Sequence, residues 1–87
     1  MTVIRKFDNM SEATVDDEVV VMRLDSGEFY SLTGTGAAIW RLIDGKRDRA
    51  RILADLSEMY QAKENEMAAD VDTYLQQLRE DGILLDP

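Results

Sequence analysis

The sequence predicts an α+β fold in which a three-stranded antiparallel sheet is followed by three α-helices. Before Thr33, short runs rich in valine and aromatic residues alternate with turn residues, a pattern typical of strands. After Thr33, apolar residues recur at the three- and four-residue spacing that is typical of helices. The chain has no internal repeat, and its one proline is Pro87. We therefore expect a single domain over residues 1–87, with residues 1–9 flexible or loosely attached.

The expected strands are Ala13–Val15, Glu18–Leu24 and Glu28–Leu32. A turn that closes with Gly27 in the left-handed region would place Leu24 opposite Glu28. We favour this register because it gathers apolar side chains on one face of the sheet. That face would carry Val20, Met22, Leu24, Tyr30 and Leu32.

Capping residues define the first two helices. Thr33 or Thr35 can cap the first helix, which ends at Asp44-Gly45, and Asp48 can cap the second. Their apolar stripes are expected to form much of the core. These stripes are Gly36, Ile39, Trp40 and Ile43 in the first helix, and Ile52, Leu53, Leu56, Met59 and Tyr60 in the second.

The third helix begins near Asn65 and stops at Asp81-Gly82. Its end is typical of a Schellman cap, with Gly82 left-handed and Ile83 folded back onto the last turn. The apolar stripe of this helix is Met67, Val71, Tyr74, Leu75 and Leu78.

The chain contains no histidine and no cysteine. Their absence excludes a Ser-His or Cys-His nucleophile pair, an imidazole base, and zinc sites built from thiolates or imidazoles. We therefore expect no enzymatic activity, no cofactor and no metal site. The sequence also lacks a signal-peptide pattern and an apolar run of membrane-spanning length, so we expect a cytoplasmic protein without a membrane partner.

Charge argues against nucleic acid as a partner, because the formal net charge is -8. The stretch 41–51 is basic, with five Lys or Arg against two Asp, and we interpret it as a solvated connection between helices rather than a partner-binding patch. Three helices beside a small sheet also suggest a winged-helix DNA regulator. However, residues 64–81 carry six acidic side chains against Arg79, the reverse of a phosphate-binding surface.

Two short motifs suggest other ligands. Gly34-Thr35-Gly36 lies between a strand and a helix, as a dinucleotide fingerprint does, but its third glycine position is Ile39. Asp25-Ser26 is similar to the serine site that carries a phosphopantetheine arm in acyl carrier proteins. There the serine begins a helix, whereas here Gly27 and a strand follow. An acyl-carrier-like protein and a winged-helix regulator remain the alternatives to the interpretation below.

The third strand, Glu28–Leu32, is expected at the edge of the sheet. It has no proline, no lysine and no inward charge, which are the usual devices that prevent pairing with another strand. If the third helix packs beside this edge, the two elements form a groove with backbone donors on one wall and apolar side chains on the other. Such a groove is suited to recognising a peptide by strand addition.

Much of the chain, roughly residues 10–86, resembles the PqqD-like family, which includes pyrroloquinoline quinone synthesis protein D and stand-alone RiPP recognition elements. The order of strand, aromatic strand, Gly-Thr-Gly-Ala, Ile-Trp and two further helices carries the resemblance. The matching runs are Asp17–Met22, Asp25–Leu32, Gly34–Gly45, Ile52–Leu56, Asp70-Val71 and 75–85.

The resemblance implies a winged helix-turn-helix variant that binds the leader of a ribosomally made precursor peptide. In this family the leader adds to the third strand and lies against the third helix. The run Phe29–Leu32 followed by Gly-Thr-Gly looks more like the lasso-peptide members than the quinone members. Thr33 stands where the family often has asparagine, so the helix cap is altered, although threonine also caps.

Carried onto this chain, the resemblance implies a non-catalytic adaptor of the lasso-peptide type. Its partners would be a precursor leader peptide and a maturation enzyme, with a transglutaminase-like leader peptidase favoured and a radical SAM enzyme as the other option. The expected peptide-binding residues are Glu28, Phe29, Tyr30, Ser31, Leu32, Met67, Val71, Tyr74, Leu75 and Leu78.

Overall fold

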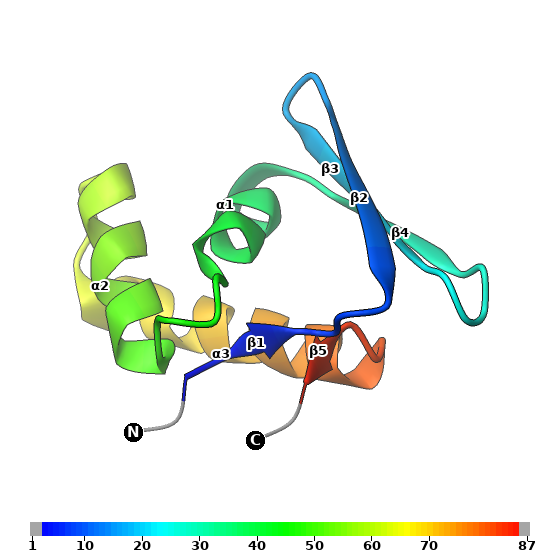
Figure 1. The fold of residues 1–87 in the computed structure, drawn as a ribbon. Coiled ribbons are helices and arrows are strands. Elements are labelled where there is room, and N and C mark those ends of the chain that lie inside the picture. Colours follow the sequence, from blue (N-terminus) through cyan, green and yellow to red (C-terminus); the bar gives the residue numbers. More distant parts are fainter. Residues whose placement is uncertain (1–2, 86–87) are drawn as a thin grey trace.

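The computed structural model describes residues 3–85 and confirms the α+β fold (Figure 1). A three-stranded antiparallel sheet with the order β2-β3-β4 is followed by three helices, and a two-stranded sheet pairs β1 with β5. The elements are β1 (Arg5–Lys6), β2 (Met10–Val15), β3 (Glu18–Arg23), β4 (Phe29–Leu32), α1 (Gly34–Leu42), α2 (Arg49–Tyr60), α3 (Glu64–Glu80) and β5 (Leu84–Leu85).

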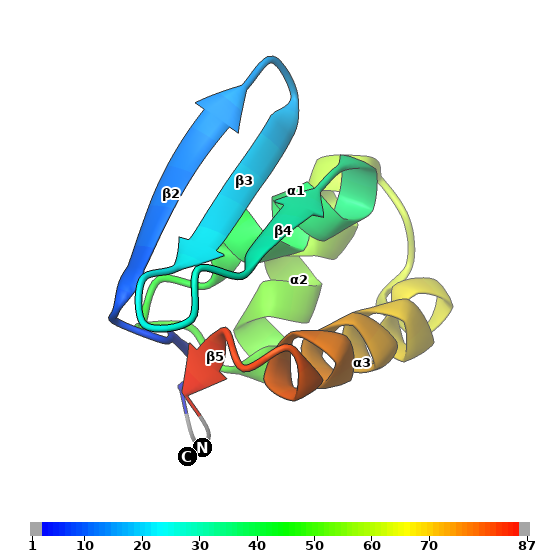
Figure 2. The ribbon, with the colours of Figure 1, turned by 90° about the vertical axis from the view of Figure 1, so that its right-hand side faces the viewer.

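The larger sheet lies to one side of the helices, and the β2–β3 hairpin extends beyond them (Figures 1 and 2). One face of β3 and β4 packs on the helical layer, while β2 is mostly exposed. The core forms where this face meets α1, α2 and α3. Its fully buried large side chains are Trp40, Ile39, Ile43, Ile52, Leu56, Leu75, Leu78, Ile83, Val19, Val21 and Val71.

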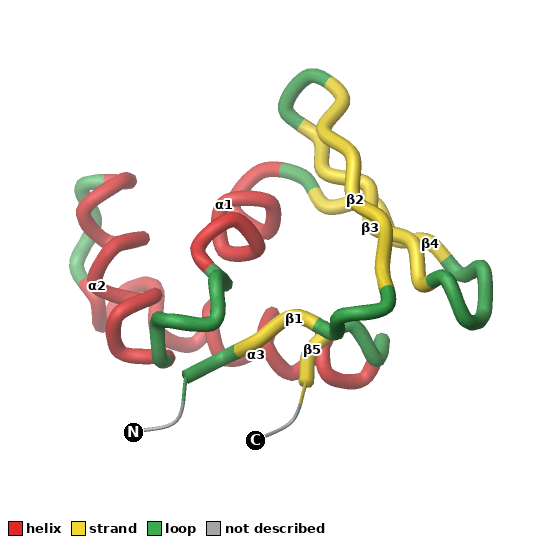
Figure 3. The backbone as a smooth tube through the Cα atoms, in the orientation of Figure 1, coloured by secondary structure: helices red, strands yellow, loops and turns green. Residues whose placement is uncertain are grey.

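The expected pairing of β3 with β4 is wrong by one residue. Val21 lies opposite Tyr30 and Val19 opposite Leu32, so the inward face carries Val19 and Val21 instead of Val20 and Met22. The cause lies in the loop between β3 and β4, in which four residues, 24–27, separate the hydrogen-bonded residues Arg23 and Glu28 (Figure 3). A loop one residue longer than expected shifts the register and leaves the Leu24 side chain 54% exposed.

The loop closes as a four-residue hairpin. Arg23 N donates to Glu28 O at 2.8 Å, and Gly27 N donates to Arg23 O at 2.9 Å. Gly27 has a φ of +76°, so the left-handed conformation expected at this glycine is present although the pairing around it differs.

The helix boundaries follow the sequence closely. Asp48 caps α2 by accepting a hydrogen bond from Arg51 N, as expected, whereas Thr33 precedes α1 without a side-chain cap bond. The second apolar stripe is shorter than expected, because Met59 and Tyr60 at the end of α2 are 59% and 46% exposed.

The end of α3 confirms the Schellman cap. Gly82 has a φ of +77°, and its N–H donates to Arg79 O. Ile83 N donates to Leu78 O at 3.1 Å, and the Ile83 side chain is fully buried. This cap directs the chain from α3 into β5 and fixes Asp81 near β4.

The strands β1 and β5 have no counterpart among the sequence-based expectations. Arg5 pairs with Leu85 and Lys6 with Leu84, and the side chain of Ile4 is buried in the core. Residues 3–9, which were expected to be loosely attached, are therefore connected to the domain at this point, while residues 1 and 2 lie outside the described part.

Three arginines of the basic stretch, Arg47, Arg49 and Arg51, form ion pairs within the chain. Arg47 pairs with Asp44 and Asp55, and Arg49 pairs with Asp72 on α3. The hydrogen bond from Arg47 holds the pKa of Asp55 below its ordinary value. These pairs connect α2 to its preceding loop and to α3.

Candidate functional site

The strand β4 lies at the edge of its sheet, with β3 as its one neighbour among the described residues. The bond from Arg23 N to Glu28 O makes that pair a hydrogen-bonded one. Because such pairs alternate along an antiparallel ladder, Tyr30 and Leu32 also direct their backbone groups toward β3. Phe29 and Ser31 therefore present their N–H and C=O groups outward, away from the sheet.

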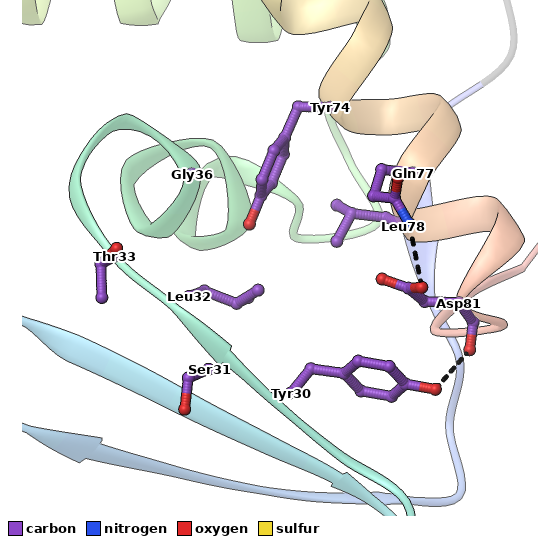
Figure 4. A pocket seen from close by; sticks show the side chains of 9 residues that line it. All are labelled: Tyr30, Ser31, Leu32, Thr33, Gly36, Tyr74, Gln77, Leu78 and Asp81. Atoms are coloured by element: carbon purple, nitrogen blue, oxygen red, sulfur yellow. Dashed lines mark hydrogen bonds between the residues drawn. The ribbon is translucent and has the colours of Figure 1, made fainter.

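A pocket of about 320 Å³ lies between this edge and α3 (Figure 4). Figure 2 shows β4 and α3 on the same side of the molecule. The pocket is therefore bounded by a strand with free hydrogen-bonding groups and by a helix. The lining residues are Tyr30, Ser31, Leu32, Thr33, Gly36, Tyr74, Gln77, Leu78 and Asp81.

Two tyrosines face the pocket from opposite walls, and they differ in how their hydroxyl groups are held. The Tyr30 hydroxyl donates to the backbone oxygen of Asp81 at 3.0 Å, which connects β4 to the end of α3. The Tyr74 hydroxyl is buried and has no hydrogen-bond partner. A fixed tyrosine and an unpartnered one thus share the same pocket.

Both tyrosines remain protonated at neutral pH. Burial raises the pKa of Tyr74 to about 12, with a further contribution from the charge of Asp81, and burial also raises the pKa of Tyr30. The Gln77 side-chain amide donates to the Asp81 carboxylate at 3.1 Å. The pocket therefore combines neutral hydroxyls and apolar surface with the Gln77 amide and the Asp81 carboxylate, a chemistry suited to binding a side chain and the backbone next to it.

The structure brings together five of the expected peptide-binding residues and places the others elsewhere. Tyr30, Ser31 and Leu32 line the pocket from β4, and Tyr74 and Leu78 line it from α3. Phe29 is 69% exposed on the strand, and Glu28 precedes it in the loop. The remaining three lie inside α3: Val71 and Leu75 are buried in the core, and Met67 packs against it.

Sequence reasoning missed four lining residues, Thr33, Gly36, Gln77 and Asp81. A helical signal for two of them exists, because Tyr74, Gln77 and Asp81 repeat at the spacing that places residues on one helix face. The expectation followed apolar residues alone, so the polar flank of this stripe was not included.

The sites of the alternative functions lie apart from the pocket. Ser26 is in the exposed β3–β4 loop, where its hydroxyl accepts a hydrogen bond from Glu28 N at 3.3 Å, and it begins no helix.

Among residues 3–85, no helix is both long enough and apolar enough to cross a membrane.

The chain is similar to known proteins in sequence and in fold. The model of the family "Coenzyme PQQ synthesis protein D (PqqD)" matches residues 18–84. No curated protein matches the sequence. Among solved structures, the chain is similar to "TbiB1 in Complex with the TbiA(beta) Leader Peptide", with 24% identity, a TM-score of 0.86, and coverage of 95% of this chain and 96% of that one.

A second solved structure is described as "Lasso peptide synthetase B1 complexed with the leader peptide". It has 24% identity and a TM-score of 0.82, and the alignment covers 95% of this chain and 98% of that one. At this level of identity the two structures show the fold, which extends over nearly the whole of each chain.

Proposed function

Because the chain belongs to the PqqD family, we propose that it is a leader-binding adaptor for a ribosomally synthesised precursor peptide. The leader adds as a strand to the outward edge of β4, and one of its side chains enters the pocket beside α3. The observation that carries this proposal is the edge itself, where Phe29 and Ser31 have outward backbone groups next to a pocket of about 320 Å³.

The arrangement suits an extended peptide better than a compact ligand. An added strand can bond to the N–H and C=O groups of Phe29 and Ser31 with little dependence on its sequence. Alternate side chains of that strand point to the same face as Tyr30 and Leu32, which line the pocket. Backbone bonds thus provide affinity, and the pocket provides selection among leaders.

Two similar structures support this assignment, since each is described as a complex with a leader peptide. The peptide-contacting residues proposed here are Phe29, Tyr30, Ser31 and Leu32 on β4 with Tyr74 and Leu78 on α3. Glu28 immediately precedes β4, Met67 lies in the first turn of α3, and we propose that both extend this surface. Val71 and Leu75 support the surface from the core.

The proposed role is non-catalytic. By holding the leader, the chain raises the local concentration of the attached core peptide at a maturation enzyme. We favour a transglutaminase-like leader peptidase as that enzyme, as the resemblance to the lasso-peptide members implies, with a radical SAM enzyme as the other option. The similar structure described as "Lasso peptide synthetase B1 complexed with the leader peptide" supports the lasso-peptide type. Addition of this chain should then accelerate leader removal by the peptidase at precursor concentrations near the dissociation constant.

Isothermal titration calorimetry tests the proposal directly. The ligands are synthetic leader segments of any short precursor peptides found to be encoded beside the gene for this chain, and the controls are a scrambled leader and the core segment of the same precursor. We expect one leader to bind with a Kd near 1 µM, about -8 kcal/mol, and neither control to bind. If no leader binds below about 100 µM, the proposed function is wrong.

A further inference from the structure

The Tyr74 hydroxyl differs from the other buried polar side-chain atoms in the described part of the chain. Its hydroxyl is the one buried side-chain oxygen or nitrogen of residues 3–85 without a hydrogen-bond partner. Folded proteins rarely leave such a group unpaired, because it has lost its bonds to water and gained none in exchange. The position of the Tyr74 ring therefore carries an energetic cost in the leader-free chain.

The ring occupies space that a glycine leaves open. A Cβ atom at Gly36 would lie 2.7 Å from both Cζ and Oη of Tyr74, closer than atoms can approach. Gly36 lies within α1 and is not among the glycines with positive φ, so its backbone does not require glycine. The glycine is explained by the ring of Tyr74, which rests against the first part of α1 (Figure 4).

The opposite wall of the pocket is fixed. Tyr30 is held at its hydroxyl by Asp81 O, and its backbone belongs to β4. The Tyr74 hydroxyl has no such bond, and the Tyr74 side chain as a whole is only partly buried. Of the two aromatic walls, Tyr74 is the one that can turn without breaking a hydrogen bond.

We infer that Tyr74 is a movable, specificity-determining wall of the groove: when a leader docks on β4, the ring turns away from Gly36 and the hydroxyl donates a hydrogen bond to a carbonyl oxygen of the leader. This inference rests on the proposed function. The unpaired hydroxyl disfavours the leader-free position, and the new bond favours the occupied one. Leaders that place a carbonyl within reach of the hydroxyl are thereby selected over those that do not. Because burial and the nearby Asp81 raise the pKa of Tyr74, the proton needed for donation is retained at neutral pH.

Tyr74→Phe separates this role from a purely structural one. The variant removes the unpaired hydroxyl from the leader-free chain, so we expect a higher melting temperature. It also removes the bond to the leader, so we expect the Kd measured with the synthetic leader to rise by about fivefold or more. Tyr60→Phe, which changes an exposed tyrosine of α2, is the matched control and should alter neither quantity.

Gly36→Ala tests the movement itself. The new methyl group displaces the Tyr74 ring from its leader-free position while the helical backbone accepts alanine. If the Tyr74 ring must move for the leader to bind, the Kd of Gly36→Ala for the leader will equal that of the parent or be lower. If the ring binds the leader in its present position, the Kd of Gly36→Ala will be higher.

Tyrosine-labelled NMR during leader titration completes the test. We expect the ring signals of Tyr74, assigned with Tyr74→Phe, to shift more than those of Tyr60. The inference is overturned if the parent binds leader while Tyr74→Phe binds equally well, or if Gly36→Ala binds more weakly. If the parent chain binds no leader, the proposed function is wrong and this inference fails with it. If the parent binds leader and only the variants behave differently from expectation, the inference alone fails.

Discussion

The region around Trp40 and the groove beside Tyr74 differ in whether their polar side-chain groups have hydrogen-bond partners. The Trp40 indole N–H donates to a Glu12 carboxylate oxygen at 2.6 Å, and Lys6 lies over the ring at 4.5 Å while also pairing with Glu12 at 3.6 Å. In the groove, the Tyr74 hydroxyl has no partner, and β4 directs backbone groups away from its sheet. The polar group of Trp40 is thus paired within the fold, whereas the Tyr74 hydroxyl and the outward backbone groups of β4 are unpaired where we place the leader.

Truncation of the core should have the largest effect. Trp40 and Leu56 are fully buried, so replacing either with alanine should lower the free energy of unfolding by about 2–5 kcal/mol. Chemical denaturation measures this change, and calorimetry on the folded fraction should give the leader Kd of the parent. A large loss of affinity per folded molecule would show that the core and the groove are not separate regions.

Proline substitutions on β4 should separate the inward and outward backbone groups. Tyr30→Pro removes an N–H directed at β3 and should break the β3–β4 pairing, whereas Ser31→Pro removes an outward N–H and should leave the domain folded. For Ser31→Pro we expect leader binding to weaken by about 1 kcal/mol or more. Circular dichroism and calorimetry check the pair. Equal loss of structure in both variants would contradict the assigned alternation.

Removing the whole Tyr74 side chain should affect binding more than folding. The ring is only partly buried and lines the groove, so Tyr74→Ala should raise the leader Kd by more than Tyr60→Ala does, while both variants stay folded. Thermal melts and calorimetry provide the comparison. Loss of stability on the scale of Trp40→Ala together with normal leader binding would place Tyr74 in the core instead.

The smallest expected effect concerns the Arg47–Asp55 ion pair and its contribution to the stability of the fold at acidic pH. The hydrogen bond from Arg47 lowers the pKa of Asp55 below its ordinary 3.8, so the unfolded chain takes up this proton first as pH falls. The stabilisation is present above about pH 4 and is lost as pH falls through the lower, folded-state pKa. Asp55→Asn should reduce the slope of melting temperature against pH in this range. An unchanged slope would show that the Arg47–Asp55 pair does not contribute.

Local signals in the sequence predicted local structure well. The Asp48 cap and the Schellman end at Gly82 depend on side-chain and backbone preferences within a few residues, and both are present. The β3–β4 register was not predicted because Val19, Val20 and Val21 are consecutive, so either face of β3 could be the apolar one. Without alternation, loop length alone decided the register.

The groove was only partly predictable for a related reason. The strand that forms one wall was predicted because its edge lacks the residues that prevent pairing. The helix residues of the other wall were chosen because they are apolar, and this criterion also selects the core residues Val71 and Leu75. The pairing of β1 with β5 involves two residues on each strand, too few to show a period in the sequence. Gly36 became informative only once the Tyr74 ring was found beside it.

Amide hydrogen exchange tests the central claim, addition of a leader strand to β4, most directly. In the free chain the N–H groups of Phe29 and Ser31 face outward, whereas that of Tyr30 is directed at β3. With saturating synthetic leader, we predict strongly slowed exchange at Phe29 and Ser31 and little change at Tyr30. Slowed exchange confined to another segment, such as the basic stretch 41–51, with β4 unchanged would contradict the account.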